Sequence, residues 1–549
     1  MTSRKHSIWL DAAISVSCGC FAGLDTAWIY GNLWTGTPYG LIVAIIGVIA
    51  GISCFAILRL LSGRLDIEPA STSYLVTLSF LAMYTAVRYY SRAGSLSERY
   101  VTIDLKIYAA LVCCSVLFLT VFFLVSYRIL SRLLGMLLDA GLDLAEWLFL
   151  ILGLWAAVNF STYAFAAHPV LHDGERYGGV LTDVIYLFDS LYHLKLDSFF
   201  LIGGVENDIR NIFFGLFQLP VSAPCHVISQ LTEAIWGVAS YPYLIAWSQG
   251  LAIVGAAILL SRCVGEGPYQ KIGFLLLFSC SYMAMLHVLI LEQYAWPLFW
   301  SSAFVYLACH GKTGSGLDTC YILGAGNLVS NALIAGPMLF YDRKRFKKLF
   351  EISFVIATGL LLISGQLSGI LRTFQMMPTT AMFFGSNLTI ANKIMQFSTF
   401  VRSVFIQPSV KAFSVTPWYV AEIDQYAAYR LSDELCFDWI GILIFGLCAV
   451  SFIWNRKDRF TQYAGWWVLV SILILLGLGW GTHENGLVIY GLHFGWAYIA
   501  LIYKLIERIF AKYGKILSAA CGVVSGIMMW RNIEGLSVLF GFLEKYYPA

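Results

Sequence analysis

A short polar stretch, GVENDIRNIFF at 204–214, carries two acids and a base within a strongly apolar chain. If it is helical, Glu206 and Arg210 stand four residues apart and can pair, which leaves Asp208 on another side of the helix. An arginine beside carboxylates suits a phosphate-bearing substrate, because a guanidinium can donate two parallel hydrogen bonds to phosphate. A plain ion pair that stabilises a helix in a surface loop is the alternative interpretation.

A single acid, Asp25, lies at the end of an apolar run in CFAGLDTAWIYGNLWTG (20–36) and is followed by three large aromatic residues. A carboxylate at that depth could take a proton, hold a metal ion or bind a sugar hydroxyl. The simpler interpretation is a helix-end acid beside an ordinary interfacial belt of aromatic residues.

Three further polar clusters have the composition of sugar-binding or metal-binding turns. The first is LHDGERYGG (171–179), with His172 and Asp173. The second is LILEQYAWPLFW (289–300), with Glu292, Tyr294 and Trp296, and the third is GWGTHENGLVIYGLHFGW (479–496), with His483, Glu484 and Asn485. Aromatic faces, acids and amides match the C–H groups and hydroxyls of a sugar. Solvated turns would explain the same residues. Because each of the last two turns joins two expected helices, we expect its polar residues at a membrane rim.

The composition shows which elements must position these residues. Of the 549 residues, 59% are hydrophobic and 12% are charged, and the mean hydropathy is +0.75. These values predict an all-α polytopic membrane protein forming one integral membrane domain, 1–549. The net charge of +3 gives no support to nucleic acid as a partner. The thirteen cysteines lack paired metal-binding spacings, and Walker, GxSxG and HExxH motifs are also missing.

About thirteen apolar runs are long enough to cross a membrane as helices. The expected crossings are 8–28, 39–61, 72–90, 105–127, 146–167, 241–262, 271–290, 294–309, 350–371, 437–454, 464–481, 486–509 and 516–534. Most loops rich in Lys and Arg fall on one side only if the apolar stretch 318–340 enters and leaves the membrane on that same side. We therefore expect a re-entrant hairpin at 318–340.

This arrangement places two long loops, 168–240 and 374–436, on the outer face together with the acidic clusters. Mixed spacing of apolar and charged residues in the first loop predicts amphipathic helices lying at the interface. The stretch 389–406 in the second loop predicts another such helix. Chemistry is therefore expected on the outer face, away from the basic loops.

A first helix followed by an outer acid at Asp25, a long outer loop with interfacial helices and many further helices resembles the C-type superfamily of multi-spanning glycosyltransferases. The resemblance implies transfer of a sugar from a polyprenyl-phosphate carrier to a glycan, lipid or protein acceptor, in a bacterial plasma membrane. It further implies that Asp25 and either Glu206 or Asp208 serve as base or metal ligand, with a divalent metal ion as a conceivable cofactor, and that Arg210 binds the carrier phosphate. The sugar or acceptor pocket would include Glu292, His483 and Glu484.

Two other classes of protein fit the same pattern. A surface-polysaccharide polymerase would also combine about a dozen helices with two large outer loops, and it should depend on outer arginines. A transporter or flippase for lipid-linked saccharides would place charges near the middle of the bilayer and on broken helices.

Overall fold

The computed structural model describes residues 141–172, 214–238, 240–265, 267–312, 314–364, 389–407, 414–416, 426–428, 437–480, 487–510 and 513–546, together with positions 16, 45, 48–49, 52 and 55. Apart from those isolated positions, the four expected crossings before residue 141 lie outside the described residues.

The described part of the chain is almost entirely helical. Its α-helices are α5 (Leu144–Ala167), α9 (Phe214–Trp236), α10 (Tyr241–Val264), α11 (Pro268–Ser279), α12 (Tyr282–Leu289), α13 (Ala295–Cys309), α14 (Ser315–Asn327), α15 (Met338–Tyr341), α16 (Arg343–Ser364), α18 (Ile390–Phe405), α19 (Trp439–Asn455), α20 (Arg459–Ser471), α21 (Gly491–Phe510) and α22 (Gly514–Tyr546). The shorter elements are the 3-10 helices η1 (Pro169–Leu171), η3 (Val329–Ala335) and η6 (Leu487–Tyr490), the π-helical segment η5 (Ile472–Gly477), and the antiparallel strands β1 (Ser414–Thr416) and β2 (Tyr426–Ala428).

Four described helices are long and apolar enough to span a membrane, which indicates a membrane protein. They are α5, α10, α20 with its π-helical continuation, and α22 over Gly514–Gly541. A fifth span would join α11 and α12, which meet at a bend of 57°. The expected crossings 294–309 and 437–454 correspond to the shorter apolar helices α13 and α19.

The expected crossing 271–290 is not one continuous helix, because the chain begins a new helix after Ser281. The Ser281 hydroxyl donates to the carbonyl of Phe278, and its oxygen accepts from the backbone N–H of Ala284 at 3.4 Å. This side chain therefore satisfies backbone groups on both sides of the break. The hydropathy of the run is continuous, so composition gave no sign of the bend.

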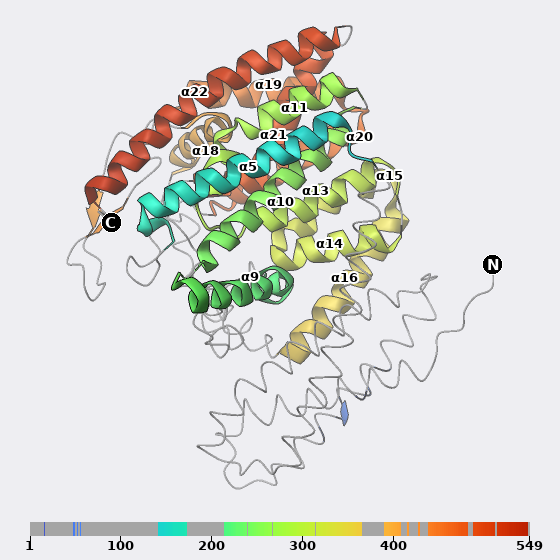
Figure 1. Cartoon of the computed structure of the whole chain (residues 1–549). Helices are drawn as coiled ribbons and strands as arrows, with labels where there is room; N and C mark the ends of the chain where they lie inside the picture. Colours follow the sequence, from blue (N-terminus) through green and yellow to red (C-terminus); the bar gives the residue numbers. More distant parts are fainter. Residues whose placement is uncertain are drawn as a thin grey trace.

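The helices form two groups that share a core. In the first, α5, α10, α13 and α14 lie side by side in that order, and α9 contacts α10 and α14 (Figure 1). In the second, α21 packs against α19 and α20, while α18 packs against α19 and α21. Contacts of α11 and α13 with α21 join the two groups, and α22 covers α11.

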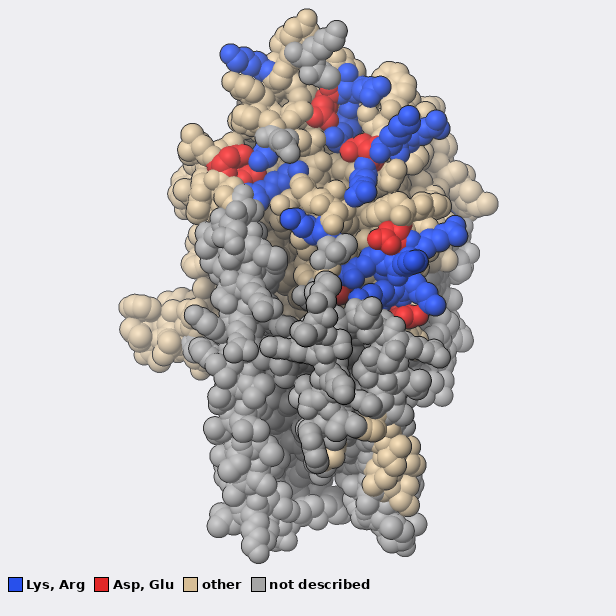
Figure 2. All heavy atoms as spheres, turned by 90° about the vertical axis from the view of Figure 1, so that its right-hand side faces the viewer, with Lys and Arg blue, Asp and Glu red and all other residues tan. Residues whose placement is uncertain are grey.

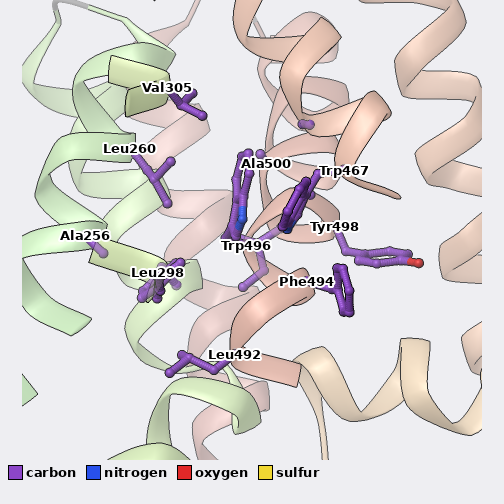
Figure 3. Close-up of a cluster of buried hydrophobic side chains, with 14 of the residues drawn as sticks. Ala256, Leu260, Leu298, Val305, Trp467, Leu492, Phe494, Trp496, Tyr498 and Ala500 are labelled. Atoms are coloured by element: carbon purple, nitrogen blue, oxygen red, sulfur yellow. The ribbon is translucent and has the colours of Figure 1, made fainter. Parts of the chain in front are cut away.

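The core lies where the two groups meet. Figure 3 shows side chains of α10 and α13, among them Leu260 and Leu298, opposite Leu492 and Trp496 of α21. These side chains belong to one continuous cluster of buried apolar residues. The aromatic rings of Trp467 and Trp496 are almost fully buried in this cluster, which fixes α20 and α21 against the first group.

Figure 2 shows Lys and Arg side chains gathered at one end of the described bundle, which we call the basic end; Arg262, Lys271 and Lys504 belong to it. Here Glu146 of α5 is fully buried and receives two hydrogen bonds from Arg262 of α10, at 2.9 and 2.7 Å. Lys271 of α11 donates to Glu146 at 2.9 Å and to Asp143 at 2.7 Å. Four buried or half-buried charges therefore tie three helices together at this end.

Candidate functional site

The structure describes four of the predicted site residues: His172, Glu292, Tyr294 and Trp296. The others, Asp25, Asp173, Glu206, Asp208, Arg210, His483, Glu484 and Asn485, lie outside the described residues. The predicted amphipathic helices before residue 204 lie there too. Within the described part of loop 168–240, the chain forms η1 and the helix α9.

The link between α12 and α13 is at the end of the bundle away from the basic end, since α13 runs from Ala295 toward the basic end. Its polar residues are buried rather than exposed at a rim: Glu292 is 4%, Gln293 5% and Tyr294 2% exposed. The alternative interpretation, a solvated turn, is therefore wrong for this link. The reason is tertiary, because α10, α21 and η6 pack around it.

Side chains from three other elements, α10, η6 and α21, hold this link in place. Gln249 of α10 donates from its amide nitrogen to the carbonyl oxygen of Glu292 at 2.7 Å. The ring of Tyr294 lies 5.8 Å from that of Tyr490 and 6.1 Å from that of His493. Trp296, by contrast, is half-buried and stacks edge to face on Phe299, and His172 contacts Phe165 and Tyr243 near the end of α5.

Residues 315–342, which we call the hairpin, leave the basic end and return to it. Its first helix begins beside Arg345, which donates to the carbonyl of Gly314 at 2.9 Å and pairs with Asp318. Arg345 also belongs to the first turn of α16, where the chain resumes after the hairpin. One side chain therefore holds both ends of the hairpin together. Whether the segment is re-entrant in a bilayer stays a prediction.

The tip of the hairpin is a break between α14 and η3. Side-chain N–H and O–H groups donate hydrogen bonds to backbone carbonyls at this break. Asn331 donates from its amide nitrogen to the carbonyls of Pro297 and Gly324, at 3.1 and 3.2 Å. Tyr321 donates to the carbonyl of Ala332, and Trp466 donates to that of Leu333. The break is therefore a specific structure held by side-chain hydrogen bonds rather than a frayed helix end.

Helix α9 reaches the same tip from outside the hairpin. The amide nitrogen of Gln218 donates to the side-chain oxygen of Asn327 at 2.6 Å, and both side chains are buried. A Cβ atom added at Gly326 would lie only 1.9 Å from the ring of Phe217, so this close approach requires glycine.

The tip meets α21 through Ser330 and His493. The Ser330 hydroxyl and His493 Nε2 are 2.9 Å apart, and the His493 ring lies edge to face against Trp467 at 5.1 Å. Trp467 also donates its indole N–H to the carbonyl of His493. The imidazole is thus fixed in orientation, and it joins the tip to the Tyr294 link.

We call the following side chains the polar cluster: Gln218, Gln249, Glu292, Tyr294, Asn327, Ser330, Asn331 and His493. Four of its buried polar atoms have no hydrogen-bond partner within the described part of the chain: Gln218 Oε1, Gln249 Oε1, Asn331 Oδ1 and His493 Nδ1. Buried polar atoms are normally hydrogen-bonded, so this concentration is unusual for an apolar bundle. Chemically, three amide oxygens and an imidazole nitrogen can bind hydroxyl groups or water.

Most of this cluster is not among the residues predicted from the sequence. The predicted sites centred on acids and bases, whereas five members of the cluster are neutral: Gln218, Gln249, Asn327, Ser330 and Asn331. A usable signal was present, since amides inside apolar runs must find partners within the protein.

The described residues include no candidate metal-binding site. Across the residues with a described structure, no three or more His, Cys, Asp or Glu side chains are grouped so that they could hold a metal ion. The predicted metal ligand Asp25 is not among those residues.

Comparison with known proteins identified no related protein. No protein-family model, curated protein or solved structure matches the chain.

Proposed function

We propose that the protein is a membrane glycosyltransferase that moves a sugar from a polyprenyl-phosphate carrier to a glycan, lipid or protein acceptor at the end opposite the basic end. The observation that carries the proposal is the buried polar cluster, in which Glu292 is buried, its carbonyl accepts from Gln249, and the ring of Tyr294 lies beside that of His493. Side chains of these kinds suit the hydroxyls and C–H faces of a sugar. The location would be a bacterial plasma membrane, with the basic end in the cytoplasm.

The proposed reaction needs a base, a phosphate-binding group and a sugar pocket. The acceptor hydroxyl oxygen attacks the anomeric carbon, the bond from that carbon to the carrier phosphate oxygen breaks, and a carboxylate takes the hydroxyl proton. We assign the base to Asp25, Glu206 or Asp208 and the binding of the departing phosphate to Arg210. Glu292, Tyr294, His483 and Glu484 would line the pocket.

The decisive experiment is mass spectrometry of surface glycans from cells that lack the gene. The strain would be complemented with wild type, Asp25→Asn, Asp208→Asn or Glu292→Gln. Glu351→Gln is the matched control, because Glu351 belongs to a solvent-accessible pair near the basic end. Loss of one defined sugar, restored by wild type and by the control but not by a carboxylate variant, would support the transferase.

A transporter of lipid-linked saccharides is the second candidate, and the hairpin is the observation that favours it. Broken helices with polar side chains at the break are the usual binding elements of transporters. Unchanged glycan composition in every complemented strain, combined with accumulation of the lipid-linked precursor in Asn331→Leu, would favour transport. Shortened chains of normal composition would instead indicate a polysaccharide polymerase.

A further inference from the structure

The N-terminal half of α16 presents a stripe that is basic at one end and aromatic at the other. Arg343, Lys347, Phe350 and Phe354 follow one another at spacings of four, three and four residues, so they lie on one face of the helix. All four are exposed: the side chain of Lys347 is 78% accessible, Phe350 is 58% and Phe354 is 63% exposed. Stacking of Phe350 on Phe354, with centroids 6.4 Å apart, makes the apolar part continuous.

Other cations surround the basic part of this stripe. Arg459 lies over the ring of Tyr341, 5.2 Å from its centroid, and Tyr341 precedes Arg343 by two residues. Gly311 lies close to Arg459, because a Cβ atom added at Gly311 would be 3.9 Å from the guanidinium. Lys312, the next residue, is therefore in the same region. The side chains of Lys312, Arg343 and Arg459 are all exposed. Figure 2 shows basic side chains gathered over this end of the bundle.

The described acids do not neutralise this group. Lys347 forms a solvent-accessible ion pair with Glu351 at 3.6 Å. Exposed ion pairs of this kind contribute little to the free energy of folding. Asp458 serves as the N-cap of α20 and lies 3.8 Å from Lys504. Asp342 accepts a hydrogen bond from the backbone of Arg345 at the start of α16. The face therefore keeps an excess of positive charge.

We propose that this face binds an anionic phospholipid, with the phosphate headgroup at Arg343, Lys347 and Arg459 and an acyl chain along Phe350 and Phe354. The stripe from residue 343 to residue 354 rises roughly 16 Å along the helix, of which the aromatic part from 350 to 354 takes about 6 Å, enough for the carbons of an acyl chain nearest the headgroup. A soluble anion would use only the cations, whereas the stripe joins cations directly to exposed aromatic rings. That continuity fits a ligand with a charged head and an apolar tail.

The test uses the full-length chain in mild detergent and measures binding of phosphatidylglycerol and phosphatidylcholine by native mass spectrometry. We expect tighter binding of phosphatidylglycerol to wild type. Each cation near a membrane surface contributes about fivefold in affinity, so Arg343→Gln should weaken binding roughly fivefold and Arg343→Gln with Lys347→Gln roughly 25-fold. The charge-preserving Arg343→Lys should retain most of the affinity.

The controls come from α22, which begins at the same end. Lys515 and Ile527 are exposed there, so Lys515→Gln and Ile527→Ala match the changes in charge and in apolar surface. Both should bind phosphatidylglycerol as wild type does, while Phe350→Ala with Phe354→Ala should lose binding. Equal binding of the two lipids, equal effects of Lys515→Gln and Arg343→Gln, or displacement of the lipid by millimolar inorganic phosphate would overturn the proposal. If a double variant fails to fold, the lipid affinities of wild type, Arg343→Lys and Arg343→Gln still test the proposal.

Discussion

The Ser330 hydroxyl lies 2.9 Å from Nε2 of His493, joining two residues that are 163 positions apart. The contact connects the break in the hairpin to the start of α21, beside the buried Tyr294 link. Because the opposite end of the hairpin is held by Arg345, the segment is fixed at both its base and its tip. The polar cluster is therefore supported by contacts from distant parts of the chain.

Replacing Ser330 by alanine should destabilise the protein by about 1–3 kcal/mol, because a buried ring nitrogen of His493 loses its partner. The measurement is unfolding in mixed micelles. Ser537→Ala is the control, since the Ser537 hydroxyl bonds the carbonyl of Glu534 on an exposed part of α22. Its cost should stay within about 0.5 kcal/mol. Equal losses in the two variants would contradict a structural role for the contact.

Replacing Glu146 by glutamine should cost about 3–5 kcal/mol, because Arg262 and Lys271 would lose a buried carboxylate. The same change at Glu534, which forms an exposed pair with Arg531, should cost roughly 0–1 kcal/mol. Chemical denaturation of both variants in the same detergent makes the comparison. A Glu146→Gln protein as stable as Glu534→Gln would show that the ion pairs only offset their own desolvation.

Gly441 is required by the contact between α18 and α19. A Cβ atom there would lie 1.8 Å from the backbone carbonyl oxygen of Ser398, which cannot move without the helix. We expect Gly441→Ala to destabilise the protein by about 1–3 kcal/mol. Gly446 lies in the same helix with nothing within 4 Å of an added Cβ, so Gly446→Ala should be neutral or slightly stabilising. The measurement is the thermal unfolding midpoint of both variants. Equal midpoints would contradict the requirement for glycine at position 441.

His168 gives the stability a pH dependence. Burial lowers the pKa of His168 below its ordinary value, against a smaller opposite effect of Glu544. The ring is 3% exposed and stacks on Phe540, with centroids 4.9 Å apart. A lowered folded-state pKa means that the unfolded chain binds the proton more readily. The stabilisation is therefore complete above the unfolded pKa of about 6.5 and is lost as the pH falls through the lower folded value.

The thermal midpoint of the wild type should accordingly drop between about pH 7 and pH 5. In His168→Gln this dependence should be weaker, whereas His310→Gln should keep it, because His310 is exposed near the basic end. A His168→Gln protein with the full wild-type dependence would assign the effect to other groups.

Several elements could be predicted from local sequence. Expected crossings at 146–167 and 241–262 match α5 (Leu144–Ala167) and α10 (Tyr241–Val264) within two residues. The amphipathic pattern at 389–406 matches the helix α18, although half of that helix is buried against α19 and α21 rather than exposed on a surface. Local prediction works here because a polar backbone in a bilayer must form helices, and the length of an apolar run sets the length of the helix.

Composition and charge by themselves indicated a helical membrane protein and the approximate bounds of α5, α10, α13 and α19, whereas α9 was not among the expected crossings and α22 extends twelve residues past the expected 516–534. The bend at Ser281 is a separate case, because its hydroxyl bonds Phe278 and Ala284 locally and hydropathy does not record such a contact. Tertiary structure decided that Glu292 is buried, that Gln249 binds its backbone, and that Ser330 meets His493. The physical reason is that hydropathy is a sum over neighbours along the chain, whereas burial and hydrogen bonding depend on residues brought together from more than 40 positions away.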